Sequence, residues 1–147
     1  MNRQMLTDTD KDKYFPEKDL GGNLMQFFYD VRNKYGRWYS EKVYDKALKE
    51  QLELKKINFI YQPRIDIYSV DTGKKISTYV PDFLIEDKIL VENKVNPYFS
   101  QENMDQALQY LKNCRYEIIY LVNFREKDFK PRRFIATNDR KFFLKSV

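Results

Sequence analysis

The sequence predicts an α/β (α+β) fold in which helices flank one central sheet. Three observations support this class. Two amphipathic helical segments come first, three β-rich segments follow, and a further helix precedes a nearly all-apolar strand at 116–124. A chain of 147 residues suits one domain. We therefore expect a flexible arm over residues 1–20 and a single domain over residues 21–147.

The first two helices are predicted from apolar residues that recur at helical spacing. Asn23 is the expected N-cap of the first helix and Gly36 its expected end. Ser40 is the expected N-cap of the second. Glu41 lies at the edge of the second helix's apolar stripe. The two stripes are Leu24, Phe27, Phe28, Val31 and Tyr35, followed by Val43, Tyr44, Ala47, Leu48 and Leu52.

The later elements are predicted from alternation, turn residues and a third helical pattern. Asp71–Gly73 is a turn signal between the first two strands. Ser100 is the expected N-cap of the third helix, which packs through Met104, Ala107, Leu108 and Leu111. The expected segments are strands at 58–70, 75–85 and 88–95, a helix at 101–114, a strand at 116–124 and a short strand at 132–137.

The composition excludes several kinds of chemistry. The chain has no histidine and a single cysteine, Cys114, so Ser-His-Asp and Cys-His catalysis, most zinc sites and an intrachain disulfide are excluded. Acid–base or metal chemistry must then use Asp, Glu, Lys and Tyr, and oxygen ligands favour Mg²⁺ or Mn²⁺.

The charge pattern and the N-terminus bear on partners and location. The net charge of +5 is compatible with a polyanionic partner, although a solvated surface explains it equally well. The N-terminus lacks the apolar region of a signal peptide, and no apolar run approaches the roughly 20 residues that cross a bilayer. We expect a cytoplasmic protein with no membrane partner.

An acid and an amine follow the apolar run "KILV" on a predicted buried strand. Acid-x-Lys also occurs at four other places, but only Glu92 and Lys94 lie directly after such a run. Because Glu92 and Lys94 are two residues apart, their side chains lie on the same face of the strand. They could form a buried ion pair, or a metal ligand with a neighbouring amine.

Asp82 joins this pair if the turn has the right length. A three-residue loop at 86–88 pairs Ile85 with Ile89, and so places Asp82 opposite Glu92, with the two Cβ atoms roughly 5 Å apart. A two-residue loop would instead pair Asp82 with Val91 and separate the acids. We expect the former, or a bulge with the same effect. Two carboxylates that close repel unless a proton or cation lies between them, which favours a divalent metal.

These residues resemble the PD-(D/E)xK nuclease superfamily. Pro81–Asp82 matches its PD element and Glu92–Lys94 its (D/E)xK element, and the element order resembles the family's restriction-endonuclease-like αβββαβ core, a central mixed sheet flanked by helices. Gln106 and Tyr110 match the Q-x-x-x-Y element of the RecB-like and Cas4-like exonuclease branch. Residues 36–52 resemble the opening of the small GxxExxY proteins, although the glycine-to-glutamate spacing is longer here.

The resemblance implies a Mg²⁺- or Mn²⁺-dependent nuclease that hydrolyses phosphodiester bonds. The partner it implies is nucleic acid, with DNA as the expected kind, and a homodimer is a possible assembly. By resemblance, Asp82 and Glu92 would ligate the metal with the backbone carbonyl of Asn93. Glu41 would bind metal-bound water or a second cation. Lys94 would orient or deprotonate the attacking water. The expected substrate-binding residues are Gln106 and Tyr110.

Plainer interpretations stay open for each of these residues. Asp82 could be a plain turn or strand-end acid. Glu92 and Lys94 could be a structural ion pair, and Glu41 could simply benefit from the helix dipole in a first turn. Gln106 could be an ordinary surface residue, and Tyr110 could border the core. The alternative function is a catalytically inactive nucleic-acid-binding or accessory module on the same fold.

Overall fold

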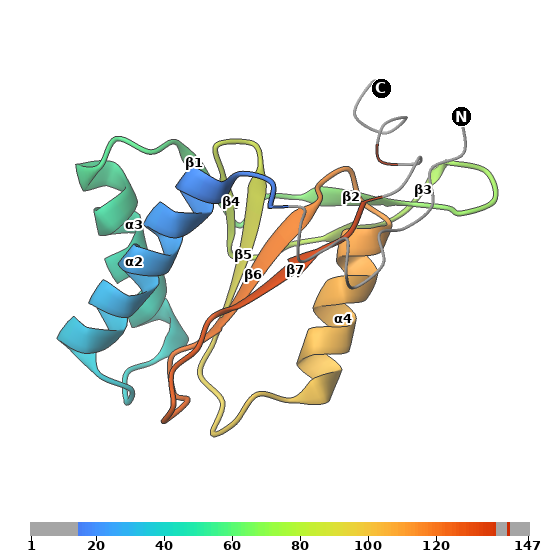
Figure 1. Cartoon of the computed structure of the whole chain (residues 1–147). Coiled ribbons are helices and arrows are strands. Elements are labelled where there is room, and N and C mark those ends of the chain that lie inside the picture. The colour runs from blue at the N-terminus through green and yellow to red at the C-terminus, as the bar shows by residue number, and fades with distance from the viewer. Residues whose placement is uncertain (1–14, 138–140, 142–147) are drawn as a thin grey trace.

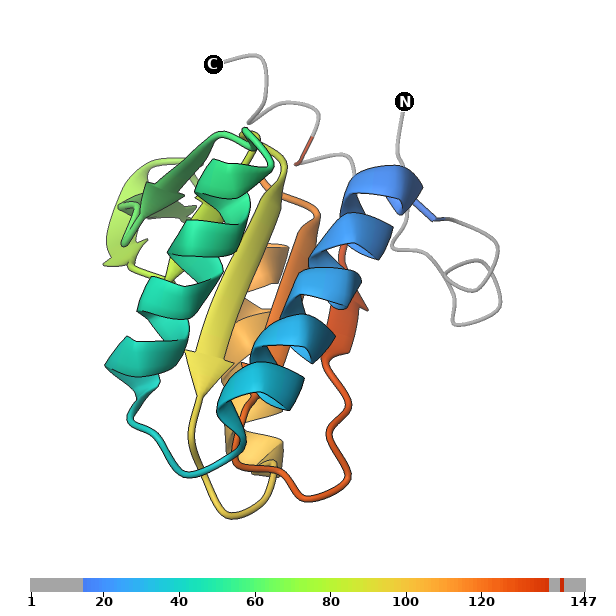
Figure 2. The same cartoon turned by 90° about the vertical axis from the view of Figure 1, so that its left-hand side faces the viewer.

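Helices cover both faces of a five-stranded sheet in the computed structural model, which describes residues 15–137 and residue 141. Helices α2 and α3 pack on one face (Figure 2), while α4 and a separate hairpin, β2–β3, lie on the other (Figure 1). The elements in chain order are α2 (Lys18–Tyr35), α3 (Glu41–Leu54), β1 (Phe59–Tyr61), β2 (Ile65–Tyr68), β3 (Lys75–Tyr79), β4 (Phe83–Ile85), β5 (Ile89–Lys94), α4 (Gln101–Lys112), β6 (Ile118–Asn123) and β7 (Arg132–Ile135).

The main sheet is mixed, with the strand order β1-β4-β5-β6-β7. Strands β5 and β6 run parallel, joined by the crossover helix α4, and every other neighbouring pair is antiparallel. Every residue of β6 is buried, which confirms the expected interior strand. The short last strand is confirmed as β7. The predicted α/β fold with a central mixed sheet is therefore correct.

Two predicted strands are each divided in two, which the sequence pattern did not indicate. Segment 58–70 breaks after Tyr61, where Gln62 has a φ of 52° and is followed by Pro63. Segment 75–85 breaks between Tyr79 and Phe83, around Pro81. A left-handed residue turns the chain, and proline cannot donate a ladder hydrogen bond. The first and last pieces join the main sheet, whereas the middle pieces form the β2–β3 hairpin.

The helix boundaries confirm most of the expected ends but not the first start. Helix α2 begins at Lys18, so Asn23 lies inside it and the expected cap is wrong. Leu20 packs against the core, and this tertiary contact outweighs the capping preference at Asn23. Of the expected flexible arm, residues 18–20 are helical, and residues 1–14 lie outside the described residues. Gly36 ends α2 as predicted, with a φ of 72°.

The other two helices begin as the sequence predicts. Ser40 precedes α3, although its side chain makes no capping hydrogen bond. Ser100 caps α4 by accepting a hydrogen bond from the backbone N–H of Asn103 at 3.0 Å. The start of α3 matters for function because it sets the position of Glu41.

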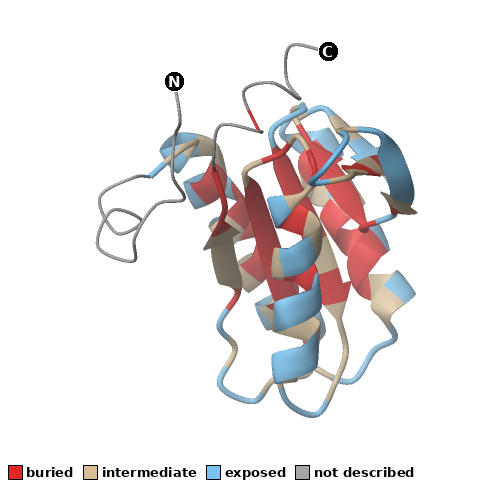
Figure 3. Cartoon of the chain, turned by 90° about the vertical axis from the view of Figure 1, so that its right-hand side faces the viewer, coloured by how far each residue is buried: buried red, intermediate tan, exposed pale blue. Residues whose placement is uncertain are grey.

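The core has one layer on each face of the sheet, and buried residues concentrate there (Figure 3). The predicted stripe of α2 is buried except Tyr35, which is 40% exposed because it occupies the last residue of the helix. On the α4 side, Ala107 and Leu111 are buried and Leu108 packs at their edge. Cys114 is buried there as a free thiol. No helix in the described part of the chain is long and apolar enough to span a membrane.

Two adjacent glycines of α2 test how closely this helix packs on the sheet. A Cβ at Gly21 would overlap the hydroxyl of the buried Tyr120, whereas a Cβ at Gly22 would meet no described residue within 4 Å. We expect Gly22→Ala to raise the free energy of unfolding by about 0.5–1 kcal/mol through helix propensity. Gly21→Ala should make the protein about 1–3 kcal/mol less stable than this control because of overpacking. Urea denaturation measures both, and equal stability of the two variants would contradict the close approach.

Candidate active site

The site forms where β5 extends beyond its neighbour β4. The predicted pairing of Ile85 with Ile89 is confirmed, and the ladder ends at Phe83 opposite Val91. Asp82 still donates its backbone N–H to the carbonyl of Val91 at 3.1 Å. Residues 92–94 of β5 continue alone along β6. The β4 side of these residues is therefore an open strand edge, and Asp82 lies beside it.

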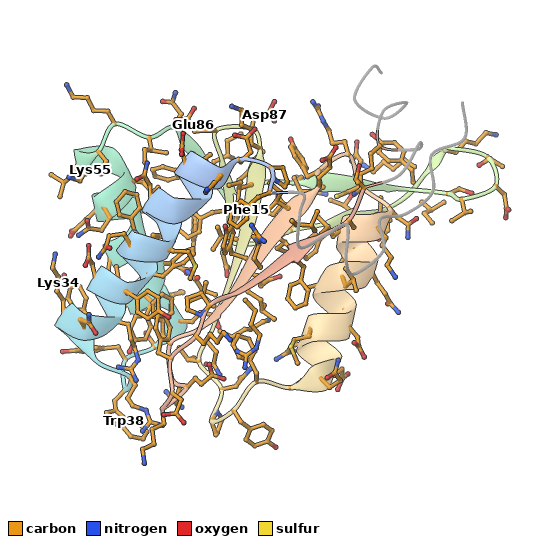
Figure 4. The ribbon with its side chains drawn as sticks, in the orientation of Figure 1. Phe15, Lys34, Trp38, Lys55, Glu86 and Asp87 are labelled. Atoms are coloured by element: carbon orange, nitrogen blue, oxygen red, sulfur yellow. The ribbon has the colours of Figure 1, made fainter. Side chains whose placement is uncertain are left out.

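A three-residue turn produces this register. Glu86 and Asp87 both have a φ of 53°, a left-handed conformation that closes the turn within residues 86–88. The Lys88 N–H completes it by bonding to the Ile85 carbonyl at 2.9 Å. The turn lies at the opposite end of the molecule from the labelled Trp38 (Figure 4), and β5 runs from the turn toward that other end.

Asp82 is a nearly buried acid held by the neighbouring strand. Its Oδ2 accepts a hydrogen bond from the backbone N–H of Asn93 at 2.6 Å. Burial, together with the nearby acids Asp45, Glu92 and Glu41, raises the pKa of Asp82 to about 8 against the opposing effect of that hydrogen bond. An ionised Asp82 thus lies in a region that already carries excess negative charge.

Glu92 is the second acid of the open edge, and two tyrosines support it. Its Oε2 accepts a hydrogen bond from the hydroxyl of Tyr79, at the end of β3. Tyr79 in turn stacks on Tyr110 of α4, with ring centroids 4.1 Å apart and planes at 6°. Burial raises the pKa of Glu92, while the Tyr79 hydroxyl and Lys94 act to lower it. Tyr110 therefore lies one side chain away from the acid.

Glu41 reaches the same region from the opposite layer. It is the first residue of α3 and is half-buried. Burial raises its pKa, Lys94 acts to lower it, and Asp45 and Glu92 act to raise it. Glu41 is therefore close enough to interact electrostatically with Lys94 and two acids. Lys94 is held in place through its carbonyl, which accepts from the Phe124 N–H at 3.0 Å.

Asp45 is a member of the site that the sequence analysis missed. It is only 4% exposed, its Oδ2 accepts from the Tyr61 hydroxyl at 2.7 Å, and its Oδ1 accepts from Asn93 Nδ2 at 2.8 Å. It follows Glu41 by one helical turn, so both acids share a side of α3. The sequence did carry a signal for Asp45, because an acid lies between Tyr44 and Ala47 of the predicted apolar stripe.

Asn93 connects the acids of both layers. Its backbone N–H binds Asp82 and its side-chain amide binds Asp45. The N–H and the carbonyl of one strand residue point to the same side, so the Asn93 carbonyl also points toward the open edge. The side-chain oxygen of Asn93 is buried and has no hydrogen-bond partner among the residues that the structure describes. The strand thus presents a carbonyl oxygen on the same side as Asp82.

The donor set suits a hard divalent cation in chemistry and in charge. The carboxylates of Asp82, Glu92 and Glu41 and the Asn93 carbonyl supply only oxygens, the ligands that Mg²⁺ and Mn²⁺ prefer. Neighbouring acids contribute to each raised pKa, because Asp45 acts on all three acids and Glu92 acts on both Asp82 and Glu41, and a cation would relieve that repulsion. Within residues 15–137 and 141, however, no three acidic, cysteine or histidine side chains converge tightly enough to hold an ion. The four-donor set remains a prediction.

Gln106 and Tyr110, the two predicted substrate-binding residues, differ in their surroundings. Tyr110 reaches Glu92 through Tyr79, as described above. Gln106 is exposed and lines a surface depression of α4 together with Gln101, Glu102, Asp105 and Gln109. Among the described residues, Gln106 makes no hydrogen bond to any of the acids. Its contact with substrate stays a prediction.

Comparisons with known proteins identify a family. Residues 18–134 match the family model of the PD-(D/E)XK nuclease superfamily, which covers most of the chain. A search of curated proteins found no match, and a search of solved structures also found none. The match includes every residue of the site.

The raised pKa of Asp82 makes stability depend on pH when no divalent cation is present. The folded protein holds this proton more tightly than the unfolded chain, so the stabilisation is complete below about pH 4 and is lost as the pH rises through about 8. Glu41 and Glu92 act in the same direction. We expect the free energy of unfolding in EDTA to fall between about pH 5 and 8, with Asp82→Asn removing a share of at most a few kcal/mol.

Urea denaturation at the two pH values measures this effect. Glu50→Gln is the matched control, because Glu50 is an exposed acid of α3. The control should keep the wild-type pH profile. An Asp82→Asn variant with the same decline as wild type would show that this acid is not the one that titrates.

Proposed function

The chain belongs to the PD-(D/E)XK nuclease superfamily, and on this premise we propose that it is a metal-dependent nuclease that hydrolyses phosphodiester bonds in DNA. One observation carries the proposal. Asp82 lies beside the open edge of β5, which carries Glu92 and Lys94, in an environment that disfavours the negative charge of both acids without a cation. Glu41 reaches the same region from α3.

The roles follow from the positions of these residues. Asp82, Glu92, the Asn93 carbonyl and Glu41 would hold Mg²⁺ or Mn²⁺, which when bound supplies Lewis-acid activation of water and of the phosphate. Lys94 would orient the attacking water through a hydrogen bond and stabilise the negative charge that develops on the phosphate. No step requires histidine, in agreement with the composition.

Several residues keep this arrangement in place. The Asn93 N–H holds the Asp82 carboxylate, and the Tyr79 hydroxyl holds that of Glu92. Stacking on Tyr110 restricts Tyr79 in turn. We propose these as positioning residues because each acts on the reacting groups through another side chain.

The finer family assignments are also proposals. Tyr44, the tyrosine of the E-x-x-Y match, is fully buried, stacks on Phe124 and donates to the Gly36 carbonyl at 2.6 Å. It thereby supports the loop that leads into Glu41, which favours the GxxExxY resemblance. The Tyr110 contact supports the RecB-like and Cas4-like resemblance. The preference for DNA, the homodimer and the cytoplasmic location stay predictions.

A second candidate function is a nucleic-acid-binding or accessory module without activity. The observation that favours it is the absence, among the described residues, of three acids close enough to share an ion. Such a module would bind nucleic acid in a salt-dependent way, and Glu92→Gln would not weaken that binding.

Nuclease assays test the leading proposal. With Mn²⁺ or Mg²⁺, we expect cleavage of single- or double-stranded DNA by the wild type, and a loss of about 100-fold or more for Asp82→Asn, Glu92→Gln and Lys94→Met. The matched controls are Glu50→Gln and Lys46→Met, exposed residues of α3 that should retain activity. Cleavage that Asp82→Asn leaves unchanged would refute the assignment.

Calorimetry separates metal binding from cleavage. We expect wild-type protein to bind Mn²⁺ with a measurable enthalpy and Asp82→Asn to lose most of that enthalpy. Burial and neighbouring acids disfavour the ionised form of Asp82, and a bound cation would relieve this. Glu50→Gln should titrate like wild type. If wild type and Asp82→Asn bind the ion identically, the acids do not share one metal site.

A further inference from the structure

Three loops lie together at the end of the molecule where the parallel strands β5 and β6 finish (Figures 1 and 2). They connect α2 to α3, β5 to α4, and β6 to β7. The carboxyl ends of parallel strands commonly border a ligand site in α/β sheets. Because Lys94 ends β5 and Glu41 begins α3, the proposed active site borders this same end.

Trp38 projects from the first of these loops. It is the only tryptophan of the chain and is 73% exposed (Figure 4). The guanidinium carbons of Arg37 and Arg125 lie over its ring, 4.7 Å and 5.8 Å from the centroid. An indole with both faces covered could not be this exposed, so one face is open. We call Trp38, Arg37 and Arg125 the Trp38 platform.

The two arginines carry charge that nothing described in the chain neutralises. Arg37 Nε donates to the Arg125 carbonyl at 2.9 Å, which brings both guanidiniums to one indole. Neither forms an ion pair with an acid in the part of the chain that the structure describes. Two adjacent cations favour an anion, and guanidinium geometry matches phosphate.

The platform lies within a short distance of the acids. Trp38 precedes Glu41 by three residues, a span of at most about 11 Å along the chain. Arg125 follows Asn123 by two residues, and Asn123 pairs with Lys94 across strands that lie about 4.8 Å apart. One nucleic-acid strand can therefore contact the platform and the acids together.

We infer that the Trp38 platform binds single-stranded nucleic acid, with one base stacked on the open face of Trp38 and its phosphates on Arg37 and Arg125. An exposed aromatic ring beside basic side chains is the arrangement that binds unpaired strands, because each base offers a face for stacking. Bases inside a duplex are already stacked on one another. The inference rests on the proposed function, since it takes the acids as the reacting centre that the strand must reach.

Binding experiments in EDTA test the platform without any cleavage. A thymine-rich single-stranded oligonucleotide should quench the Trp38 fluorescence, and the blunt duplex of the same sequence should do so far less. In anisotropy titrations with the labelled single strand, Trp38→Ala should weaken binding by about 5- to 150-fold. Trp38→Phe should retain most of the affinity. Arg125→Gln should reduce the slope of log K against log salt by about 0.7.

Matched controls use exposed residues outside the platform. Leu54→Ala, at the far end of α3, and Arg64→Gln should bind like wild type. Wild-type affinity for the single strand in Trp38→Ala would overturn the platform, as would equal quenching by the duplex. If Trp38→Ala loses binding and wild type cleaves nothing with Mn²⁺, the platform stands and the proposed nuclease function fails. If wild type cleaves DNA and Trp38→Ala binds the single strand like wild type, the proposed nuclease function stands and the platform fails.

Discussion

The pairing register of β4 with β5 is the constraint on which the rest of the site depends. Side chains alternate between the faces of a strand, so a slip of one residue would move Asp82 to the opposite face from Glu92. The turn at 86–88 prevents the slip by placing two consecutive residues in the left-handed region. Pro81 then ends the regular strand at the point where Asp82 faces the open edge.

Several acids are buried together at one end of the sheet. Asp82, Glu92 and Glu41 each have a pKa raised first by desolvation and also by neighbouring acids, of which Asp45 acts on all three. Asn93 partly offsets this with two donated hydrogen bonds, one to each layer. A fold does not gain stability from such a cluster, because burying unpaired charge is costly. The arrangement is therefore better explained by function than by stability.

The proposed chemistry and the proposed recognition of substrate lie on different kinds of structure. The acids lie on a strand edge and a helix start, where regular structure holds them precisely. The exposed aromatic ring and the arginines lie on the loops that follow, where side chains are accessible to a long substrate. The two groups adjoin because α3 begins three residues after Trp38 and because β6 leads directly into the loop of Arg125.

The sequence by itself determined the three helices, the strands β5 and β6 and the three-residue turn between β4 and β5. These features depend on local signals, namely helical spacing in α3, the apolar run before Glu92 and the length of one turn. Contacts between distant segments decided the rest. Asp45 enters the site only because α3 packs over Asn93, 48 residues away in the chain. Tyr79 meets Glu92 only because the strand from 75 to 85 divides at Pro81 and lets β3 leave the main sheet. Local periodicity cannot report such contacts, because they arise from the packing of whole layers.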